Sequence, residues 1–175
     1  MKLFRFLNKS FSEREKELIK LLSKGGLFDN LTEDEIAQFI PHLFLRQYKH
    51  NEVIFFTSDP SQALYVVKSG MISLNLELKD GFEKLLTLKK GRIFGDNSML
   101  EKTRRLYTAI VETELAEVYT IPQINLFEIM NDHPAIKAKM MTNFAEMHNQ
   151  YASELIKAYK SSFGFFELNT VYRSL

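Results

Sequence analysis

The stretch from residue 72 to residue 88 constrains the fold more tightly than any other part of the chain. Four apolar residues alternate with polar ones: Ile72, Leu74, Leu76 and Leu78. A period of two is typical of a half-buried β-strand. Asp80-Gly81 follows, and this pair supplies the positive φ angles of a tight turn before Leu85, Leu86 and Leu88. The stretch therefore predicts an antiparallel hairpin.

The hairpin belongs to a longer region of short apolar runs, from Phe44 to about Ile121. The other runs are 52–56, 64–67, 109–111 and 118–121. Turn residues separate them, as at Ser58-Asp59-Pro60, Ser69-Gly70 and Gly91. Closely spaced strands broken by turns are typical of a closed or two-sheet antiparallel β fold.

Helical segments flank this β region. Ser12 with Glu15, and Thr32 with Glu35, have the spacing of a capping box, which predicts two helix starts. The apolar face of the first predicted helix is Leu18, Ile19, Leu21 and Leu22, and this helix ends near Gly25-Gly26. The second carries Ile36, Phe39 and Ile40 and stops at Pro41. After the strands we predict a short helix over 122–130 and a long one from Pro134 to about Lys160.

Composition excludes several classes of protein. With 45% hydrophobic residues and fifteen Phe among 175 residues, the chain is expected to fold rather than stay disordered. A net charge of +1 gives no overall attraction to nucleic acid. The chain has no Cys, which removes disulfides and thiolate chemistry and fits a cytoplasmic location. No run approaches the roughly twenty apolar residues of a membrane span, so we expect a soluble protein without a membrane partner.

The first residues of the chain mix basic and apolar side chains. Arg5 and Lys9 interrupt the apolar ones, so no secretory signal is expected. We expect Leu3, Phe4, Phe6 and Leu7 to pack on the domain, and an interfacial membrane anchor is the alternative.

A catalytic or metal site is not expected. The four histidines, His42, His50, His133 and His148, are scattered outside the central predicted strands. Metal-dependent β-barrel enzymes need clustered His and carboxylate ligands on adjacent strands. Nucleophile elbows, Walker loops and paired catalytic carboxylates are also absent from the sequence. We therefore predict no enzyme, no catalytic residues and no resident cofactor.

The segment RIFGDNSMLEKTRRLYTAI, residues 92–110, suggests an anion site. It sets Gly95 beside Asp96 and places Arg104 and Arg105 a short loop later. Amides at a helix start after Gly95 would point at a phosphate, and a guanidinium would add charged hydrogen bonds. The simpler interpretation is that adjacent arginines on a loop are solvated and that Asp96 is a helix cap.

These features, in their order, resemble the cyclic-nucleotide-binding domain family. The resemblance covers roughly residues 27–160 and rests on several anchors: Leu27-Phe28, Leu31-Thr32, Tyr48, Glu52–Phe55, Asp59-Pro60, Leu64-Tyr65, Ser69-Gly70, Gly81 and Gly91. Asn51 stands where the family usually has Gly. The resemblance implies an α+β fold: an antiparallel β jelly-roll barrel with short N-terminal helices and a long C-terminal helix.

The resemblance also implies a phosphate-binding cassette at residues 94–108. Phe94-Gly95-Asp96 resembles the Phe-Gly-Glu that opens it, with Asp96 shorter than Glu by one methylene. Residues 103–108, Thr-Arg-Arg-Leu-Tyr-Thr, resemble Thr-Pro-Arg-Ala-Ala-Thr, which places the phosphate arginine at Arg105. A second register puts Leu106 at that position. The implied ligand-binding residues are Gly95, Asp96, Asn97, Ser98, Arg105, Leu106 and Tyr107.

Three departures from the family pattern keep two functions open. Leu106 and Tyr107 replace small residues, and Ser98 replaces a common Ala. The first hypothesis is a non-catalytic regulatory module that binds cyclic AMP, cyclic GMP or a related phosphorylated ligand and signals through the long helix. The second is a degenerate fold that acts as a dimeric interaction scaffold without nucleotide.

The resemblance divides the chain into four parts. They are a helical extension (1–26), the β-barrel (27–133), the long helix (134–160) and an aromatic tail (161–175). Only about fifteen residues follow the long helix in this sequence. A helix-turn-helix DNA-binding module is therefore not expected within it.

The long helix carries an apolar stripe with spacings of three and four. Its members are Ile136, Met140, Phe144, Met147, Tyr151, Leu155 and Ala158. Such a stripe is typical of a coiled-coil seam. We predict a homodimer through Met140, Phe144, Met147, Tyr151 and Leu155, with a possible regulatory protein partner. The alternative is that the first half packs on the barrel and that Phe163, Phe165 and Phe166 cover the rest.

Overall fold

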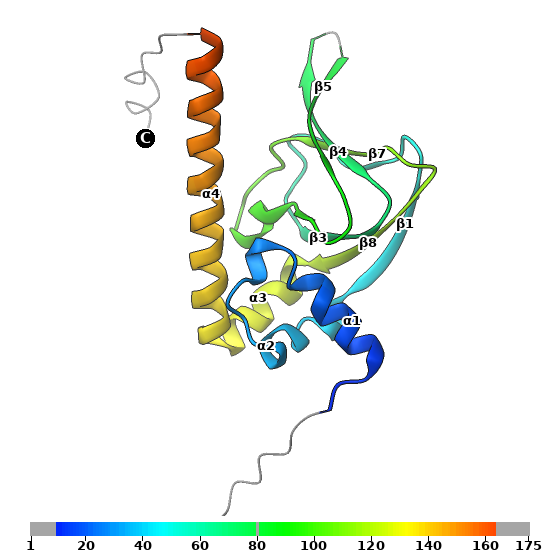
Figure 1. Ribbon diagram of the computed structural model, residues 1–175, viewed down its shortest axis with the longest axis vertical. Coiled ribbons are helices and arrows are strands. Elements are labelled where there is room, and N and C mark those ends of the chain that lie inside the picture. Colours follow the sequence, from blue (N-terminus) through cyan, green and yellow to red (C-terminus); the bar gives the residue numbers. More distant parts are fainter. Residues whose placement is uncertain (1–9, 80, 164–175) are drawn as a thin grey trace, which may run out of the picture.

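The computed structural model describes residues 10–79 and 81–163, and within them the β region forms two four-stranded antiparallel sheets (Figure 1). The first sheet has the order β1 (Phe44–Lys49), β8 (Leu115–Pro122), β3 (Ala63–Ser69), β6 (Ile93–Phe94). The second has the order β2 (Val53–Phe55), β7 (Thr108–Val111), β4 (Ile72–Leu78), β5 (Gly81–Leu88). The predicted jelly-roll fold class is confirmed.

Both predicted capping boxes form at the start of a helix. Ser12 caps α1 (Glu13–Leu22) and Thr32 caps α2 (Glu33–Ala37), each with the reciprocal glutamate contact. The short 3-10 turn η1 (Gly26–Phe28) connects α1 to α2, and a second one, η2 (Ile40–His42), connects α2 to β1. The four apolar residues predicted for the face of α1 are all buried.

The described residues form two apolar clusters. One joins α1, α2 and η1 to α3 (Gln123–Asp132) and α4 (Pro134–Phe163), and it includes Leu22, Phe28 and Met140. The other fills the space between the sheets, with Phe55, Phe94 and Val118 among its members. Because α1 contributes to the first cluster, the N-terminal helix and the C-terminal helix share one core.

The β4–β5 hairpin is present, but its burial differs from the half-buried alternation that the sequence predicts. Ile72 to Asn75 are buried on both faces, whereas Leu76 and Leu78 are exposed. A register shift between Leu74 and Asn75 separates these two parts. Beyond that point the hairpin projects past the other strands (Figure 1). Asp80 of the predicted turn lies outside the described residues.

Helix α4 is a straight rod along one side of the molecule (Figure 1). It begins at the predicted Pro134 and ends at Phe163. Its first half is attached to the N-terminal helices by an ion pair between Lys139 and Glu35, 2.7 Å apart, and by a hydrogen bond from Asn143 Nδ2 to the Leu27 carbonyl, 3.1 Å long. No helix in the described ranges is long and apolar enough to cross a membrane.

Three predictions concern residues outside the described ranges. They are the packing of Leu3, Phe4, Phe6 and Leu7, the alternative membrane anchor there, and the role of Phe165 and Phe166. The four-part division of the chain also stays a prediction.

Candidate ligand-binding cassette

The cassette begins where β6 ends. Gly95 has a φ of 71°, and the 3-10 helix η3 (Asp96–Met99) follows it. A Cβ atom at Gly95 would lie 2.5 Å from Arg105 Nη1 and 3.1 Å from the Ala63 carbonyl oxygen. Glycine is therefore required here both for its backbone conformation and for the close approach of the guanidinium.

Arg105 is the central side chain of the cassette. Only 3% of it is exposed, and its guanidinium donates to the Gly95 carbonyl at 3.0 Å and to the Ala63 carbonyl at 2.7 Å. Its centre lies 4.2 Å from the Phe55 ring centroid. Burial lowers the pKa of the Arg105 guanidinium, although arginine remains charged in proteins.

The positive charge of Arg105 has no ion-pair partner among the described residues. Its Nε atom is buried without a hydrogen-bond partner, as is the hydroxyl of Ser98 on η3. Buried polar groups are usually satisfied, and a buried charge is usually paired. Asp96 acts on this charge only from beyond ion-pair distance, so the cassette holds a buried cation without an ion pair and a buried hydroxyl without a hydrogen bond, which is a favourable environment for an anion.

The residues next to Arg105 in the sequence are exposed to solvent rather than buried in the cassette. Leu106 is 67% exposed, and Arg104 is exposed and donates to the Ser58 carbonyl at 2.7 Å. Of the two registers for the cassette arginine, this geometry favours Arg105. It also fits the expectation that Arg104 is solvated.

Tyr107 lies inside the site that a phosphate would use. Its hydroxyl accepts a hydrogen bond from the Gly95 amide at 3.1 Å, and its ring centroid is 5.7 Å from that of Phe55. Burial is the main cause that raises the pKa of Tyr107, so its phenol stays neutral at ordinary pH. The protein's own side chain therefore occupies the Gly95 amide, which directly precedes the amides of η3 that are expected to point at a phosphate.

Asn97 connects the two ends of the cassette. Its side-chain oxygen accepts from Ser61 Oγ at 2.8 Å and from Arg105 Nη1 at 3.3 Å. Its side-chain nitrogen donates to the Arg104 carbonyl. Among the predicted site residues, Gly95, Asn97, Arg105 and Tyr107 are joined by hydrogen bonds, whereas Leu106 lies apart from them.

Asp96 contacts a residue that was not among the predicted site residues. His148 of α4 places its Nε2 atom 2.9 Å from Asp96 Oδ2. The His148 ring lies 4.2 Å from that of Phe144 and 5.8 Å from that of Tyr151. A signal for this role was present, since His148 falls one helical turn after Phe144 on the apolar stripe.

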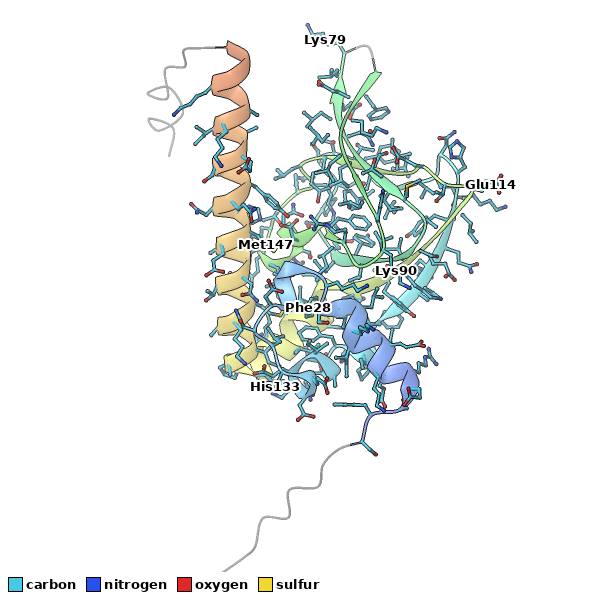
Figure 2. The ribbon with its side chains drawn as sticks, viewed as in Figure 1. Phe28, Lys79, Lys90, Glu114, His133 and Met147 are labelled. Atoms are coloured by element: carbon cyan, nitrogen blue, oxygen red, sulfur yellow. The ribbon has the colours of Figure 1, made fainter. Side chains whose placement is uncertain are left out.

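The five residues predicted for a dimer interface fall into two groups. Met140 and Phe144 are buried in the chain's own helical core. Met147 is partly buried and lies on the face of α4 turned toward the body, close to Gly26 (Figure 2). Tyr151 and Leu155 are exposed. Within one chain, the stripe therefore leaves only its distal part for a second copy.

The other histidines do not gather into a site. Within residues 10–79 and 81–163, no three His, Asp or Glu side chains come together as metal ligands.

Comparisons with known proteins place this geometry in context. The sequence profile named cyclic nucleotide-binding domain matches residues 45–133. Glutaminase 1 of Bradyrhizobium diazoefficiens is 30% identical over 127 residues, which are 72% of this chain and 20% of that protein. The cyclic AMP receptor protein of Thermus thermophilus is 27% identical over 158 residues, covering 81% of this chain and 73% of that one. The chain spans about a fifth of the glutaminase.

The fold agrees with solved structures of the same kind. The regulatory domain of Toxoplasma gondii PKA, crystallised with cAMP, superposes with a TM-score of 0.62 at 17% identity, over 69% of this chain and 46% of that one. The profile match covers just over half of the chain and includes the whole cassette from Phe94 to Thr108. The chain belongs to the cyclic nucleotide-binding domain family.

Proposed function

We propose that this chain is a non-catalytic, cytoplasmic regulatory module that binds cyclic AMP, cyclic GMP or a related phosphorylated ligand at the cassette. The observation that carries the proposal is the buried guanidinium of Arg105, which has no carboxylate partner among the described residues. A cyclic phosphate carries one negative charge, and a guanidinium can bind it with two parallel hydrogen bonds.

Ligand entry would require a rearrangement of Tyr107. Its hydroxyl occupies the Gly95 amide, so a phosphate oxygen would have to replace it there. The exchange trades a neutral hydrogen bond for a charged one, and charged hydrogen bonds are roughly twice as strong. The closed cassette would thus be the unliganded state, opened by an anion.

The signal would pass to α4 through Asp96. A carboxylate at this position can accept a hydrogen bond from a ribose hydroxyl, but Asp96 is already bound to His148 of α4. A ligand that takes Asp96 would release this attachment. Because of this competition, the ligand would bind more tightly when α4 is detached from Asp96 than when it is attached. A ligand can act as a switch only if its affinity differs between two such states.

The second candidate is a scaffold that does not bind nucleotide. Tyr107 favours it, because its ring fills space beside Phe55 and its hydroxyl satisfies the Gly95 amide without any ligand. In that case α4 would present its exposed distal face to a second copy or to another regulatory protein.

Titration of the purified chain with cyclic AMP and cyclic GMP tests the first candidate. Arg105→Ala should lose about 10- to 150-fold in affinity, corresponding to roughly 1.5–3 kcal/mol for a charged hydrogen bond. Arg104→Ala, one residue away and exposed, is the matched control and should lose far less. Because Arg105 also binds two backbone carbonyls, circular dichroism must show that the variant is folded. Equal affinities for the wild type and a folded Arg105→Ala would reject the assignment.

Tyr107→Phe separates the two candidates. Phenylalanine keeps the ring that packs on Phe55 but frees the Gly95 amide, so nucleotide binding should strengthen by about 2- to 10-fold, the value of one neutral hydrogen bond. Tyr107→Ala then reports on space: stronger binding means that the ring blocks the pocket, and weaker binding means that it stacks on the base. A chain that binds no nucleotide in the wild type or in either variant is the scaffold.

A further inference from the structure

A second pocket lies away from the cassette, between α1 and the first sheet. It has a volume of about 370 Å³, and none of its lining residues belongs to residues 94–108. Four of those residues are lysines from separate parts of the chain: Lys20 in α1, Lys24 just after it, Lys68 in β3 and Lys90 in the β5–β6 turn. We call this the lysine pocket.

The charge of the lysine pocket is not a consequence of the composition. The whole chain has a net charge of only +1, with 23 basic and 22 acidic residues. The one carboxylate in the pocket lining is Glu17, and it forms no ion pair with any of the four lysines. The four lysines outnumber the carboxylates around this pocket, so their charges repel one another, and a bound anion would relieve that repulsion.

Only one of the four ammonium groups has an acidic partner in the described part of the chain. Lys68 lies 3.0 Å from Glu117. No hydrogen bond or ion pair within residues 10–79 and 81–163 involves the side chains of Lys20, Lys24 or Lys90. Three lysine ammoniums, with three donors each, are therefore available to a ligand.

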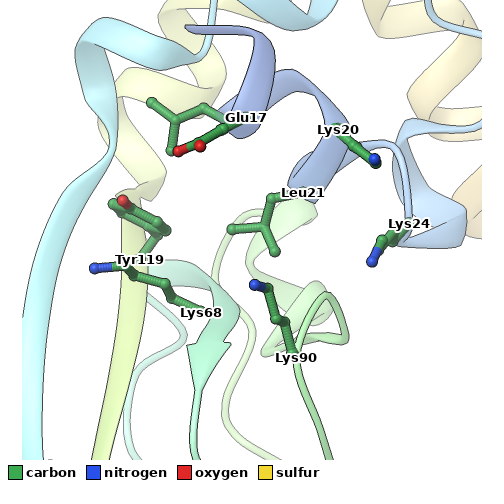
Figure 3. A pocket seen from close by; sticks show the side chains of 8 residues that line it. Glu17, Lys20, Leu21, Lys24, Lys68, Lys90 and Tyr119 are labelled. Atoms are coloured by element: carbon green, nitrogen blue, oxygen red, sulfur yellow. The ribbon is translucent and has the colours of Figure 1, made fainter. Parts of the chain in front are cut away.

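Close packing positions one of the lysines of the pocket, Lys24. The stem of Lys24 rests on Gly91, where an added Cβ would meet Lys24 Cδ at 2.9 Å. Gly91 has a φ of 86°, and this tight turn carries the adjacent Lys90. Figure 3 shows Lys90 pointing from the turn toward Leu21, with Lys20 and Lys24 at one rim and Lys68 beside Tyr119 at the other. An apolar floor with charged groups at its rim is typical of a small-molecule site.

We propose that the lysine pocket is a binding site for a small polyanion that carries more than one phosphate group. A single phosphate would engage only part of the rim, whereas an oligophosphate would reach ammonium groups on both the α1 side and the turn side. The volume of the pocket suits a small ligand rather than an extended polymer. The turn of Lys90 leads through β6 directly to Gly95, so occupancy of this pocket would be felt next to the cassette.

The experiment titrates the full chain with sodium tripolyphosphate by calorimetry, at constant ionic strength. We expect saturable binding that falls roughly tenfold or more in Lys24→Gln/Lys90→Gln, because two charged hydrogen-bond donors are lost. The matched control is Lys49→Gln/Lys89→Gln, which removes the same charge, with Lys89 directly beside Lys90. Absence of saturable binding, or an equal loss in both double variants, overturns the proposal.

A second measurement uses the unmodified chain and so does not depend on the folding of variants. Lysine acetylation followed by mass spectrometry should show that tripolyphosphate protects Lys20, Lys24 and Lys90 but not Lys49 or Lys89. Uniform protection of all five contradicts a defined site.

Vesicles distinguish a free anion from a lipid headgroup with the same chemistry. Phosphatidylcholine vesicles with and without phosphatidylinositol bisphosphate are sedimented with the protein. Tripolyphosphate binding without co-sedimentation supports a soluble ligand. Co-sedimentation that requires the bisphosphate and is lost in Lys24→Gln/Lys90→Gln assigns the site to a headgroup. If co-sedimentation persists in that variant and tripolyphosphate does not bind, the pocket is not a polyanion site.

Discussion

The two halves of α4 carry one continuous apolar stripe but have opposite environments. From Ile136 to Phe144 the stripe is buried against α3 and the N-terminal helices. At Leu155 it is 72% exposed. The lesson is that regular spacing shows where a helix has an apolar face, while the length of the neighbouring elements decides how much of that face the chain itself covers.

Shortening a side chain in the buried half of α4 should have the largest effect on stability. Met140→Ala should lower the free energy of unfolding by about 2–5 kcal/mol, because it removes a fully buried side chain and leaves a cavity. Leu155→Ala at the exposed end should change it by less than about 0.5 kcal/mol. Urea denaturation of both variants, at a concentration where the protein is monomeric, gives the comparison. Similar losses in the two variants would mean that the distal half of α4 is also covered within one chain.

Features that depend on neighbouring residues could be predicted from the sequence, whereas burial, which depends on distant elements, could not. The two capping boxes and the β4–β5 hairpin depend on residues a few positions apart, and both predictions are confirmed. The burial of the hairpin was not predictable, because alternation fixes a strand but not how far the partner sheet extends beneath it. Leu76 and Leu78 satisfy the pattern and are nevertheless exposed.

In the cassette too, local sequence patterns identify positions but not the contacts of single side chains. Gly95, Asp96 and Arg105 could be singled out from motif order, and the structure joins Arg105 to Gly95 by a hydrogen bond, while their role in ligand binding stays a prediction. The contact between Asp96 and His148 joins residues 52 positions apart, and only the packing of α4 brings them together. The direction of Tyr107 depends on the aromatic cluster around Phe55, which no local pattern describes.

The exposed half of α4 should control assembly if it is the dimer interface. We expect a wild-type mass near twice 20.5 kDa by light scattering at micromolar concentration. Tyr151→Glu/Leu155→Glu should give a folded monomer, because like charges would meet their copies across a two-fold axis. Glu128→Ala/Glu146→Ala, also exposed and on helices α3 and α4, is the control and should keep the wild-type mass. A wild-type mass near 20.5 kDa would show that the exposed stripe serves some other partner or none.

His148 lies at the boundary between the two halves of α4, and its substitution should have the smallest but most informative effect. If its contact with Asp96 competes with a ligand, as the proposed function requires, His148→Gln should strengthen nucleotide binding by up to about fivefold. The limit follows because the contact between His148 and Asp96 is partly exposed to solvent, and such a contact contributes at most about 1 kcal/mol. His133→Gln, exposed at the end of α3, serves as the control and should leave the affinity unchanged. The measurement is again a calorimetric titration. A weaker affinity in His148→Gln would mean that α4 helps to hold the ligand instead of being released by it, and the proposed direction of signalling would have to be reversed.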